Sequence, residues 1–410
     1  MNKRKKPELL APAGSPEILK TAIRYGADAV YIGSASLSLR KGAKNAGIRE
    51  LADCVSYAHE RGKRVYVAVN VFAHNTDIEE ARAYLKELDS ASPDALIISD
   101  PGILMLAKEL IPSADIHIST QANCTNYESF RFYHMLGAKR VVAARELSLA
   151  ELREIREKLP DGPEIECFVH GSMCISYSGR CLLSAYMTGR SANSGACTHP
   201  CRWQYALVEE KRPGQYFPVE EDGRGTYIMN SKDLNMIGHV PELMEAGIDS
   251  FKIEGRMKTA LYVASVTRAY RRAIDACFED PAGYEALLPE LEEEVQKCTV
   301  RDFTTGFYFG RPDENALILS GATYERNYIY LGTAGETRPD GMFALTQKNK
   351  FAVGDRIEIM RPDGEDRSAS VLRIENAEGY AMENCPHAGE ALFIRLSEQV
   401  SPGDVLRMKG

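Results

Sequence analysis

The sequence lacks the features that mark several common classes of protein. Its 410 residues contain no apolar run of about 18 residues, the length that a membrane-spanning helix needs. A Gly-rich dinucleotide fingerprint after the first predicted strand is absent, and so is the GxxxxGK phosphate loop. The serine-hydrolase elbow GxSxG and the zinc-protease motif HExxH are missing as well. These absences argue against a membrane span, Rossmann-type or P-loop nucleotide binding, and the commonest hydrolase types.

The sequence also has no excess of positive charge. It contains 50 Lys and Arg against 58 Asp and Glu, a net charge of -8. This balance argues against nonspecific nucleic-acid binding by the whole surface, but it allows a local basic face for one structured RNA. The basic N-terminus has an apolar stretch that is too short and broken for a signal peptide. We therefore expect a cytoplasmic protein, in a reducing compartment where clustered cysteines more often indicate a metal site or catalysis than disulfides.

Short apolar runs, most of them followed by an amphipathic helical segment, recur through the first two thirds of the chain. Their near-continuous apolar character is typical of buried parallel strands. The eight runs are residues 8–14, 29–33, 64–70, 95–100, 115–123, 140–147, 164–171 and 249–256. Eight such repeats predict an α/β fold, a (β/α)8 TIM-like barrel over residues 1–283. The alternative is a doubly wound open sheet.

The connection between the seventh and eighth predicted strands is much longer than the others and covers about residues 172–248. We expect its strand-like runs 202–210 and 225–233 to form a β-hairpin across the linker 211–224. An insertion at this place in a TIM barrel lies on the C-terminal face, where active sites are found. Residues 284–320 are expected to form a connector, and the turn-rich alternation of 321–410 predicts a small all-β barrel domain.

Four of the ten cysteines lie in this insertion, with the spacing C-x6-C-x15-C-x3-C. They are Cys174, Cys181, Cys197 and Cys201. Thiolates in a Gly/Ser-rich loop can hold a soft metal centre, either zinc or an iron–sulfur cluster. Zinc sites usually contain closely spaced cysteine pairs, and the first gap here is wider. The spacing favours an iron–sulfur cluster, while zinc and an unliganded or redox role stay open.

Three segments resemble one known family. The stretch ECFVHGSMCISYSGRCLLS, residues 166–184, matches the pattern E-x-F-x2-G-S-M-C-x4-G-x-C-x-L-S of the peptidase U32, or collagenase-like, family. ELLAPAGS at 8–15 and SFKIEGRMK at 250–258 are similar to segments of the same family. The resemblance extends over essentially the whole chain, including its β-rich C-terminal part.

The resemblance implies a function that the family's name does not suggest. In architecture the chain is most similar to the branch that hydroxylates the wobble uridine of tRNA to 5-hydroxyuridine. Membership of this branch implies a [4Fe–4S] cluster on Cys174, Cys181, Cys197 and Cys201. It also implies tRNA as a partner, prephenate as the hydroxyl donor and a related U32 protein as a partner subunit. Two other functions stay open, a collagenase-like peptidase that pairs Cys174 with His170, and a zinc-stabilised RNA-binding protein.

Polar residues near the predicted strand ends and the cysteines are candidates for the rest of the site, because TIM-barrel chemistry lies at the C-terminal strand ends. The candidates for catalysis are His170, Arg180, Glu254 and Arg256, and those for substrate binding are Asn70, Gln121, Asn123, Arg145, Lys252, Tyr177 and Trp203. Arginines suit the carboxylates of prephenate, histidine suits proton transfer, and aromatic rings suit stacking on a flipped base. A structural hydrogen bond, ion pair or packing contact is the plainer alternative for each.

Overall fold

The chain forms two compact units in the computed structural model. The structure describes residues 5–33, 46–174, 176–177, 180–203, 206–208, 216–218, 230–310, 317–318 and 325–410. Unit 1 comprises residues 1–16, 28–257 and 301–323, and unit 2 comprises residues 17–27, 258–300 and 324–410. This grouping differs from the expected boundaries at 283 and 320, because residues 258–300 group with the C-terminal domain. In the described part of the chain, no helix is both long and apolar enough to cross a membrane.

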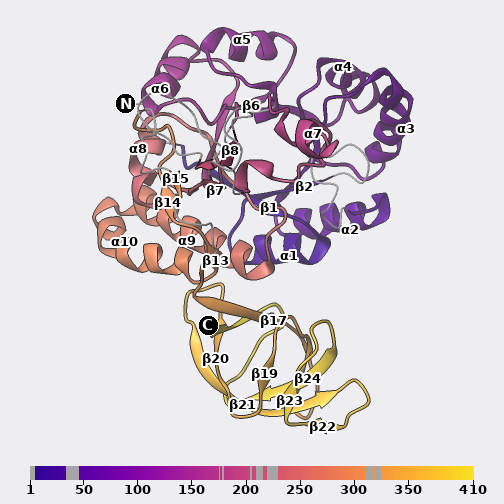
Figure 1. The fold of residues 1–410 in the computed structure, drawn as a ribbon, viewed down its shortest axis with the longest axis vertical. Helices are drawn as coiled ribbons and strands as arrows, with labels where there is room; N and C mark the ends of the chain where they lie inside the picture. Colours follow the sequence, from indigo (N-terminus) through magenta and orange to yellow (C-terminus); the bar gives the residue numbers. More distant parts are fainter. Residues whose placement is uncertain are drawn as a thin grey trace. The chain divides into compact units, whose positions relative to one another are not determined.

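Unit 1 contains the predicted closed barrel of eight parallel strands (Figure 1). The strands are β1 (Glu8–Ala13), β2 (Ala29–Gly33), β3 (Arg64–Val69), β4 (Ala95–Ile98), β5 (Asp115–Ile118), β6 (Arg140–Val142), β7 (Glu164–Ser172) and β12 (Ser250–Ile253). Each strand pairs with the next in chain order, and β12 closes the barrel by pairing with both β7 and β1. Nearly every residue of these strands is buried, which explains why the apolar runs predicted them so well.

Helices of this unit follow the strands in the expected alternation. They are α2 (Ile48–His59), α3 (Ile78–Asp89), α4 (Pro101–Leu110), α5 (Tyr127–Met135), α6 (Leu149–Lys158) and α8 (Val240–Glu245). Side chains cap the N-termini of α4, α5 and α6: Asp100 accepts two N–H groups of α4, the Asn126 side chain accepts the Ser129 N–H, and the Ser148 hydroxyl accepts the Glu151 N–H. These caps satisfy backbone donors that a helix start leaves without partners.

The insertion after β7 does contain a hairpin, but its pairing differs from the prediction. Strand β8 (Ala206–Val208) pairs antiparallel with β9 (Tyr216–Pro218), which lies in the segment expected to be the linker. The expected partner run instead holds β10 (Asn230–Ser231), which pairs with β15 (Leu317–Ile318). The prediction of the second hairpin strand was therefore wrong, because β10 finds its partner far along the chain. The same run ends in β11 (Asp233–Asn235), which pairs with β7 and with β14 (Phe303–Thr304).

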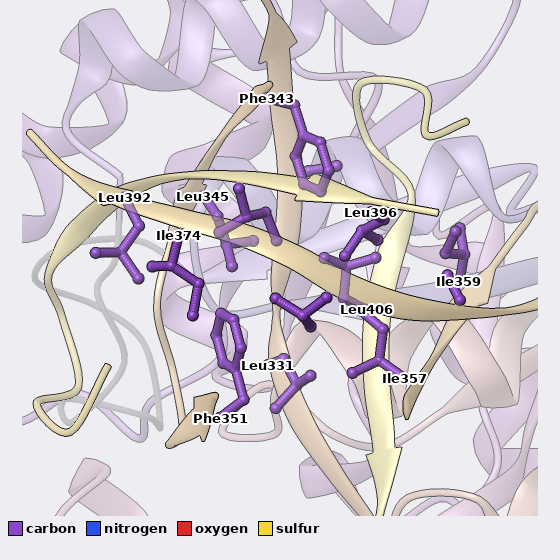
Figure 2. Close-up of a cluster of buried hydrophobic side chains, with 14 of the residues drawn as sticks. Leu331, Phe343, Leu345, Phe351, Ile357, Ile359, Ile374, Leu392, Leu396 and Leu406 are labelled. Atoms are coloured by element: carbon purple, nitrogen blue, oxygen red, sulfur yellow. The ribbon is translucent and has the colours of Figure 1, made fainter. Parts of the chain in front are cut away.

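Unit 2 contains the predicted small β-barrel. Its strands are β17 (Tyr328–Thr337), β18 (Phe343–Thr346), β20 (Arg356–Met360), β21 (Arg367–Asn376), β24 (Ala391–Leu396) and β25 (Val405–Lys409). They form an antiparallel sheet in the order β20-β25-β17-β18-β24-β21, and a β20–β21 pairing closes it. Figure 2 shows the side chains of Leu331, Phe351 and Leu406 gathered in one buried cluster inside this barrel. That cluster is the core of the domain.

A buried ion cluster joins two helices of unit 2 to its barrel. Helices α9 (Ala260–Glu279) and α10 (Pro281–Gln296) pack against each other, and α10 carries Glu294. The guanidinium of Arg407 on β25 is fully buried and lies 2.9 Å from Glu294, 3.0 Å from Glu358 and 3.0 Å from Asp366. One cation thus holds a helix and two parts of the barrel together, which gives a physical reason for the grouping of α10 with the β-domain.

Candidate functional site

A pocket opens in unit 1 where the parallel strands end. The space between its lining side chains, with the open mouth included, is about 490 Å³. Several residues predicted for catalysis or substrate binding line it: Asn70, Gln121, Arg145, Lys252, Glu254 and Arg256. They converge because closing a parallel barrel brings the carboxyl ends of all its strands to one face. The pocket is therefore the natural place for a small polar ligand.

Opposite charges face each other in this pocket. The guanidinium of Arg145 lies 3.7 Å from the Glu254 carboxylate and stacks over the Phe168 ring at 4.0 Å from its centroid. The Tyr31 hydroxyl donates to the Ile253 carbonyl at 3.0 Å and lies 3.4 Å from Glu254. Because 3.7 Å exceeds a direct N–H···O bond, the Arg145 guanidinium keeps donor capacity for a second anion. The geometry suits a ligand that carries a carboxylate.

A buried network of charges adjoins the pocket inside the barrel. The Lys252 ammonium donates to Glu166 at 2.7 Å, and Arg140 donates to Glu166 at 2.9 Å and to Glu8 at 2.6 Å. The Ser250 hydroxyl lies 3.2 Å from both carboxylates. Glu8, Glu166 and Lys252 each belong to one of the three family-like segments, so those segments meet in this network. Lys252 belongs to the network and also lines the pocket.

The network is held in the charged state by its own geometry. Burial alone would raise the pKa of Glu166, but Lys252 and Arg140 hold it below its ordinary value. The Tyr66 hydroxyl donates to Glu8 at 2.8 Å, and burial together with Glu8 raises the pKa of Tyr66. The neighbouring His117 ring stands edge-on to Tyr66, with centroids 4.7 Å apart. Burial and then Arg140 lower the pKa of His117, so the imidazole is neutral at physiological pH.

Hydroxyl groups position the cysteine-bearing insertion. Helix α7 (Leu183–Thr188) begins two residues after Cys181, and its Ser184 is buried. The Ser184 hydroxyl accepts the Thr198 N–H at 3.0 Å, and the Thr188 hydroxyl lies 3.1 Å from that of Thr198. Thr198 directly follows Cys197. These bonds therefore fix the segment of Cys181 beside the segment of Cys197, and they give a structural role to the serine that ends the family pattern.

The cysteine-bearing insertion is bonded to the barrel beside the pocket. The Phe72 N–H, shortly after β3, donates to the Asn193 carbonyl of the insertion at 3.4 Å. Asn70, two residues before Phe72, lines the pocket. Removal of its thiol from water raises the pKa of Cys174. The insertion that carries the cysteines thus adjoins the pocket.

The cysteine loop offers sulfur atoms that are soft metal ligands, and one of them accepts a backbone hydrogen bond. The His199 N–H donates to the Cys197 sulfur at 3.4 Å, a kind of hydrogen bond that tunes iron–sulfur clusters. Cys201 lies in the short 3₁₀ turn Pro200–Arg202 that follows. Among the described residues, no three Cys, His, Asp or Glu side chains surround one point as ligands of a single metal ion. The iron–sulfur cluster and its zinc alternative both stay predictions.

Two of the residues predicted from the barrel strand ends, His170 and Asn123, lie outside the pocket lining. His170 is buried within β7, where its ring packs against Phe303 with centroids 5.4 Å apart. Gly171 follows it with φ 107°, a left-handed conformation that favours glycine and explains the glycine of the family pattern. Asn123 ends a 3₁₀ turn with φ 58°, which asparagine tolerates better than most residues. The catalytic role of His170 and the binding role of Asn123 stay predictions.

The insertion presents large apolar side chains to solvent. Tyr186 is 88% exposed, Tyr177 is 58% exposed and Trp203 is 46% exposed. Leu182 and Arg180 in the same insertion are also exposed. Exposed aromatic rings beside a cation are the groups that stack on and neutralise single-stranded nucleic acid. Tyr177, Arg180 and Trp203 were predicted from the sequence, and the structure places all three on the surface of the insertion.

Sequence reasoning missed the charges inside the barrel and part of the pocket wall. It did not single out Glu8, Arg140 or Glu166 as a network. It also omitted these pocket-lining residues: Tyr31, Ser119, Thr120 and Phe168. A charged residue inside an otherwise apolar strand, such as Glu166 in EIECFV, was the signal that could have found the network, because a buried charge requires a partner.

Comparisons with known proteins agree with this architecture. Residues 14–317 match Peptidase family U32, and residues 326–407 match the Peptidase family U32 C-terminal domain. The tRNA hydroxylation protein P1 of Bacillus subtilis (strain 168) is 38% identical over 404 residues, which cover 98% of this chain and 95% of that protein. The tRNA hydroxylation protein P of Escherichia coli (strain K12) is 37% identical over 444 residues, covering 98% and 97%.

A relative with a different name matches over a similar length. The collagenase of Porphyromonas gingivalis (strain ATCC BAA-308 / W83) is 33% identical over 413 residues, which cover 97% of each chain. The two tRNA hydroxylation proteins and the collagenase therefore all align with both parts of this chain. The matched regions together account for nearly the whole sequence, including the cysteine loop and the β-domain. On this ground the chain belongs to peptidase family U32.

Proposed function

We propose that this protein is an enzyme of tRNA modification that hydroxylates wobble uridine to 5-hydroxyuridine. In this proposal Cys174, Cys181, Cys197 and Cys201 hold a [4Fe–4S] cluster, and prephenate in the barrel pocket is the hydroxyl donor. The near full-length similarity to proteins named for tRNA hydroxylation supports the reaction class. When bound, such a cluster supplies one-electron redox chemistry. We place the protein in the cytoplasm, where tRNA and reduced thiols occur together.

One structural observation carries the proposal: the cysteine loop adjoins the barrel pocket. The Phe72 N–H donates to the Asn193 carbonyl of the insertion at 3.4 Å, and Asn70, two residues earlier, lines the pocket with Lys252, Glu254 and Arg256. A redox centre would thus stand next to a cavity that can bind a small anion. A peptidase needs instead a thiol paired with an accessible histidine. His170 is buried against Phe303, which makes it a poor base for Cys174.

The pocket offers the groups that a dicarboxylate requires. In the proposal, Arg145 and Arg256 bind the carboxylates of prephenate, while Lys252 contributes positive charge from the floor. Asn70 and Gln121 supply amides for hydroxyl and carbonyl groups of the ligand. Arg145 is already stacked on Phe168, so little side-chain entropy is lost when it binds an anion.

The exposed rings of the insertion would receive the RNA. Tyr177, Tyr186 and Trp203 can stack on unpaired bases of an anticodon loop, and Arg180 can neutralise a phosphate. Stacking on an aromatic ring contributes about 1–3 kcal/mol per base. The wobble base is unpaired in free tRNA, so presenting it to the pocket costs less than flipping a base out of a duplex.

A gain-of-function experiment tests the proposal directly. The chain is expressed in a strain whose tRNA lacks 5-hydroxyuridine, and tRNA nucleosides are analysed by mass spectrometry. We expect 5-hydroxyuridine or its derivatives to appear, and to disappear with Cys174→Ala. Cys385→Ala is the matched control, because Cys385 is buried in the core of the β-domain and is not one of the four cysteines of the loop. No modified uridine with the unaltered chain, in cells that produce prephenate, would refute the proposal.

Metal analysis separates the proposal from its two rivals. Protein purified without oxygen should contain iron and acid-labile sulfide in similar amounts, and both should fall with Cys181→Ala. A colourless protein that contains zinc and no iron would support a zinc-stabilised RNA-binding protein. Cleavage of collagen-like peptides that is lost in Cys174→Ala, with unchanged metal content, would support a peptidase. A related U32 partner subunit would appear as a second U32 chain that co-purifies with the tagged protein.

A further inference from the structure

A second cavity, in unit 2, lies outside the proposed active site. With its open mouth included, its space is about 1690 Å³, against about 490 Å³ for the barrel pocket. Its wall comes from α1 (Pro16–Arg24), from the loop after β20, from the β17–β18 turn and from the segment that follows β24. Phe343 and Leu396, both drawn in Figure 2, connect this wall to the core of the β-barrel. We call this cavity the β-domain groove.

Most of the acidic groups in the β-domain groove are already neutralised. Asp404 accepts from Arg24 at 3.0 Å, and Glu398 lies 3.3 Å from Arg367. Asp363 accepts the Glu365 N–H at 3.0 Å and is the carboxylate of the wall that has no cation beside it among the described residues. These contacts leave little negative charge in the groove to repel an anion.

Two arginines of the wall keep their charge available. Arg361 donates to the Gln399 carbonyl at 2.8 Å, and neither Arg361 nor Arg395 has a carboxylate within ion-pair distance in the described part of the chain. Arg395 is exposed, and its guanidinium lies over Gly341, where a Cβ would come within 3.6 Å of it. Gly341 has φ 83°, a backbone conformation that favours glycine.

We propose that the β-domain groove binds the phosphodiester backbone of the RNA substrate through Arg361 and Arg395. Guanidinium groups recognise phosphate through two parallel hydrogen bonds, and a backbone carbonyl already orients Arg361. The open groove is far larger than a lone phosphate requires, which favours a polymer. Apart from the tRNA assignment, this inference is independent of the cluster and of the hydroxyl donor. It rests on the proposed function only for the identity of the RNA.

The test is the salt dependence of tRNA binding by the full chain. Dissociation constants for an unmodified tRNA transcript are measured between 50 and 200 mM KCl for the unaltered protein and for Arg361→Gln/Arg395→Gln. Loss of two phosphate contacts should reduce the slope of log binding constant against log salt concentration by about 1.4. The ratio of the two proteins' affinities for tRNA should therefore shrink by about sevenfold between 50 and 200 mM KCl. Arg361→Lys/Arg395→Lys keeps both charges and should keep most of the slope.

Matched controls make the result specific. Lys350→Gln/Arg356→Gln removes the same charge from exposed residues of the β-domain that do not line the groove, and its slope should equal that of the unaltered protein. The inference is overturned if the unaltered chain does not bind tRNA or if millimolar UMP displaces the tRNA. It is also overturned if Arg361→Gln/Arg395→Gln and Lys350→Gln/Arg356→Gln show the same salt slope. Displacement by UMP would identify a mononucleotide site instead.

The two proposals can fail separately. A chain that binds tRNA through the groove but produces no 5-hydroxyuridine in cells would defeat the proposed reaction and leave the groove intact. A chain that hydroxylates tRNA while Arg361→Gln/Arg395→Gln retains the full salt slope would defeat only the groove. Unchanged melting temperatures are expected for the Gln variants, since Arg395 is exposed and Arg361 has no ion pair among the described residues.

Discussion

Replacing Arg140 by methionine should destabilise the barrel of unit 1 strongly. The Arg140 guanidinium is buried and contacts Glu8 at 2.6 Å, Glu164 at 2.6 Å and Glu166 at 2.9 Å. Methionine fills a similar volume but leaves Glu8 and Glu166 with less compensation in a place that water does not reach. Removing one partner of a buried ion pair costs about 3–5 kcal/mol. We expect a loss in that range in the free energy of unfolding.

The adjacent residue provides the control for that prediction. Lys139 pairs with Asp115 at 2.6 Å, as short a contact, but both side chains are about half exposed, at 49% and 45%. An exposed pair contributes about 0–1 kcal/mol, so Lys139→Met should lose no more than that. Urea unfolding followed by circular dichroism measures both variants, and native-state hydrogen exchange in peptides from β6 and β7 localises the effect. A loss below 1 kcal/mol for Arg140→Met would refute the assigned role of the network.

The same variant makes a prediction about acid. The pKa of Glu166 is depressed in the folded protein, so its contribution to stability is present above the unfolded pKa and is lost as pH falls through the folded pKa. Removing Arg140 weakens this depression. The stability of Arg140→Met should therefore fall less steeply with acid, and the gap between the two proteins should narrow below about pH 4, near the pKa of an unfolded glutamate. A gap that stays constant would contradict this explanation.

Three further predictions concern other parts of the molecule. Thr198→Val removes the hydroxyl that lies 3.1 Å from those of Ser184 and Thr188, and it should accelerate iron loss to a chelator without changing the secondary structure measured by circular dichroism. Arg407→Met leaves the buried Glu294 with Arg268, at 3.0 Å, as its nearest remaining cation, and deprives Glu358 and Asp366 of Arg407. It should lower the melting temperature of the β-domain in calorimetry by several degrees, with no such effect for Arg356→Met at the surface. Trp203→Ala should weaken binding of an anticodon-stem-loop RNA by about 1–3 kcal/mol in fluorescence anisotropy, whereas an unchanged affinity would remove the ring from the RNA-binding surface.

Burial explains which parts of the fold could be predicted. Strands such as β4 (ALII) and β2 (AVYIG) are buried on both faces, so their own residues record their environment as continuous apolar runs. The hairpin partner of β8 could not be found in this way. Strand β9 is three residues long and contains Pro218, and β10 pairs with a segment nearly ninety residues later in the chain. No local pattern encodes a pairing at that separation.

The candidate site also has a part that the sequence could predict and a part that only the folded chain shows. Strand-end position was enough to find six pocket residues, because a parallel barrel gathers its strand ends at one face. His170 also lies on a barrel strand, yet its ring packs against Phe303 from β14, a contact that strand position could not reveal. Phe303 comes from a segment more than 130 residues further along the chain, so only the folded arrangement shows it.

The sequence by itself determined the barrel strands, the cysteine spacing and the family to which the chain belongs, because local hydrophobicity and motif spacing are written residue by residue. The tertiary structure decided which charges neutralise each other. Glu8, Arg140, Glu166 and Lys252 come from four strands and form one network only because β12 closes the barrel against β1 and β7. Electrostatic partnership depends on distance through space, and barrel closure sets that distance.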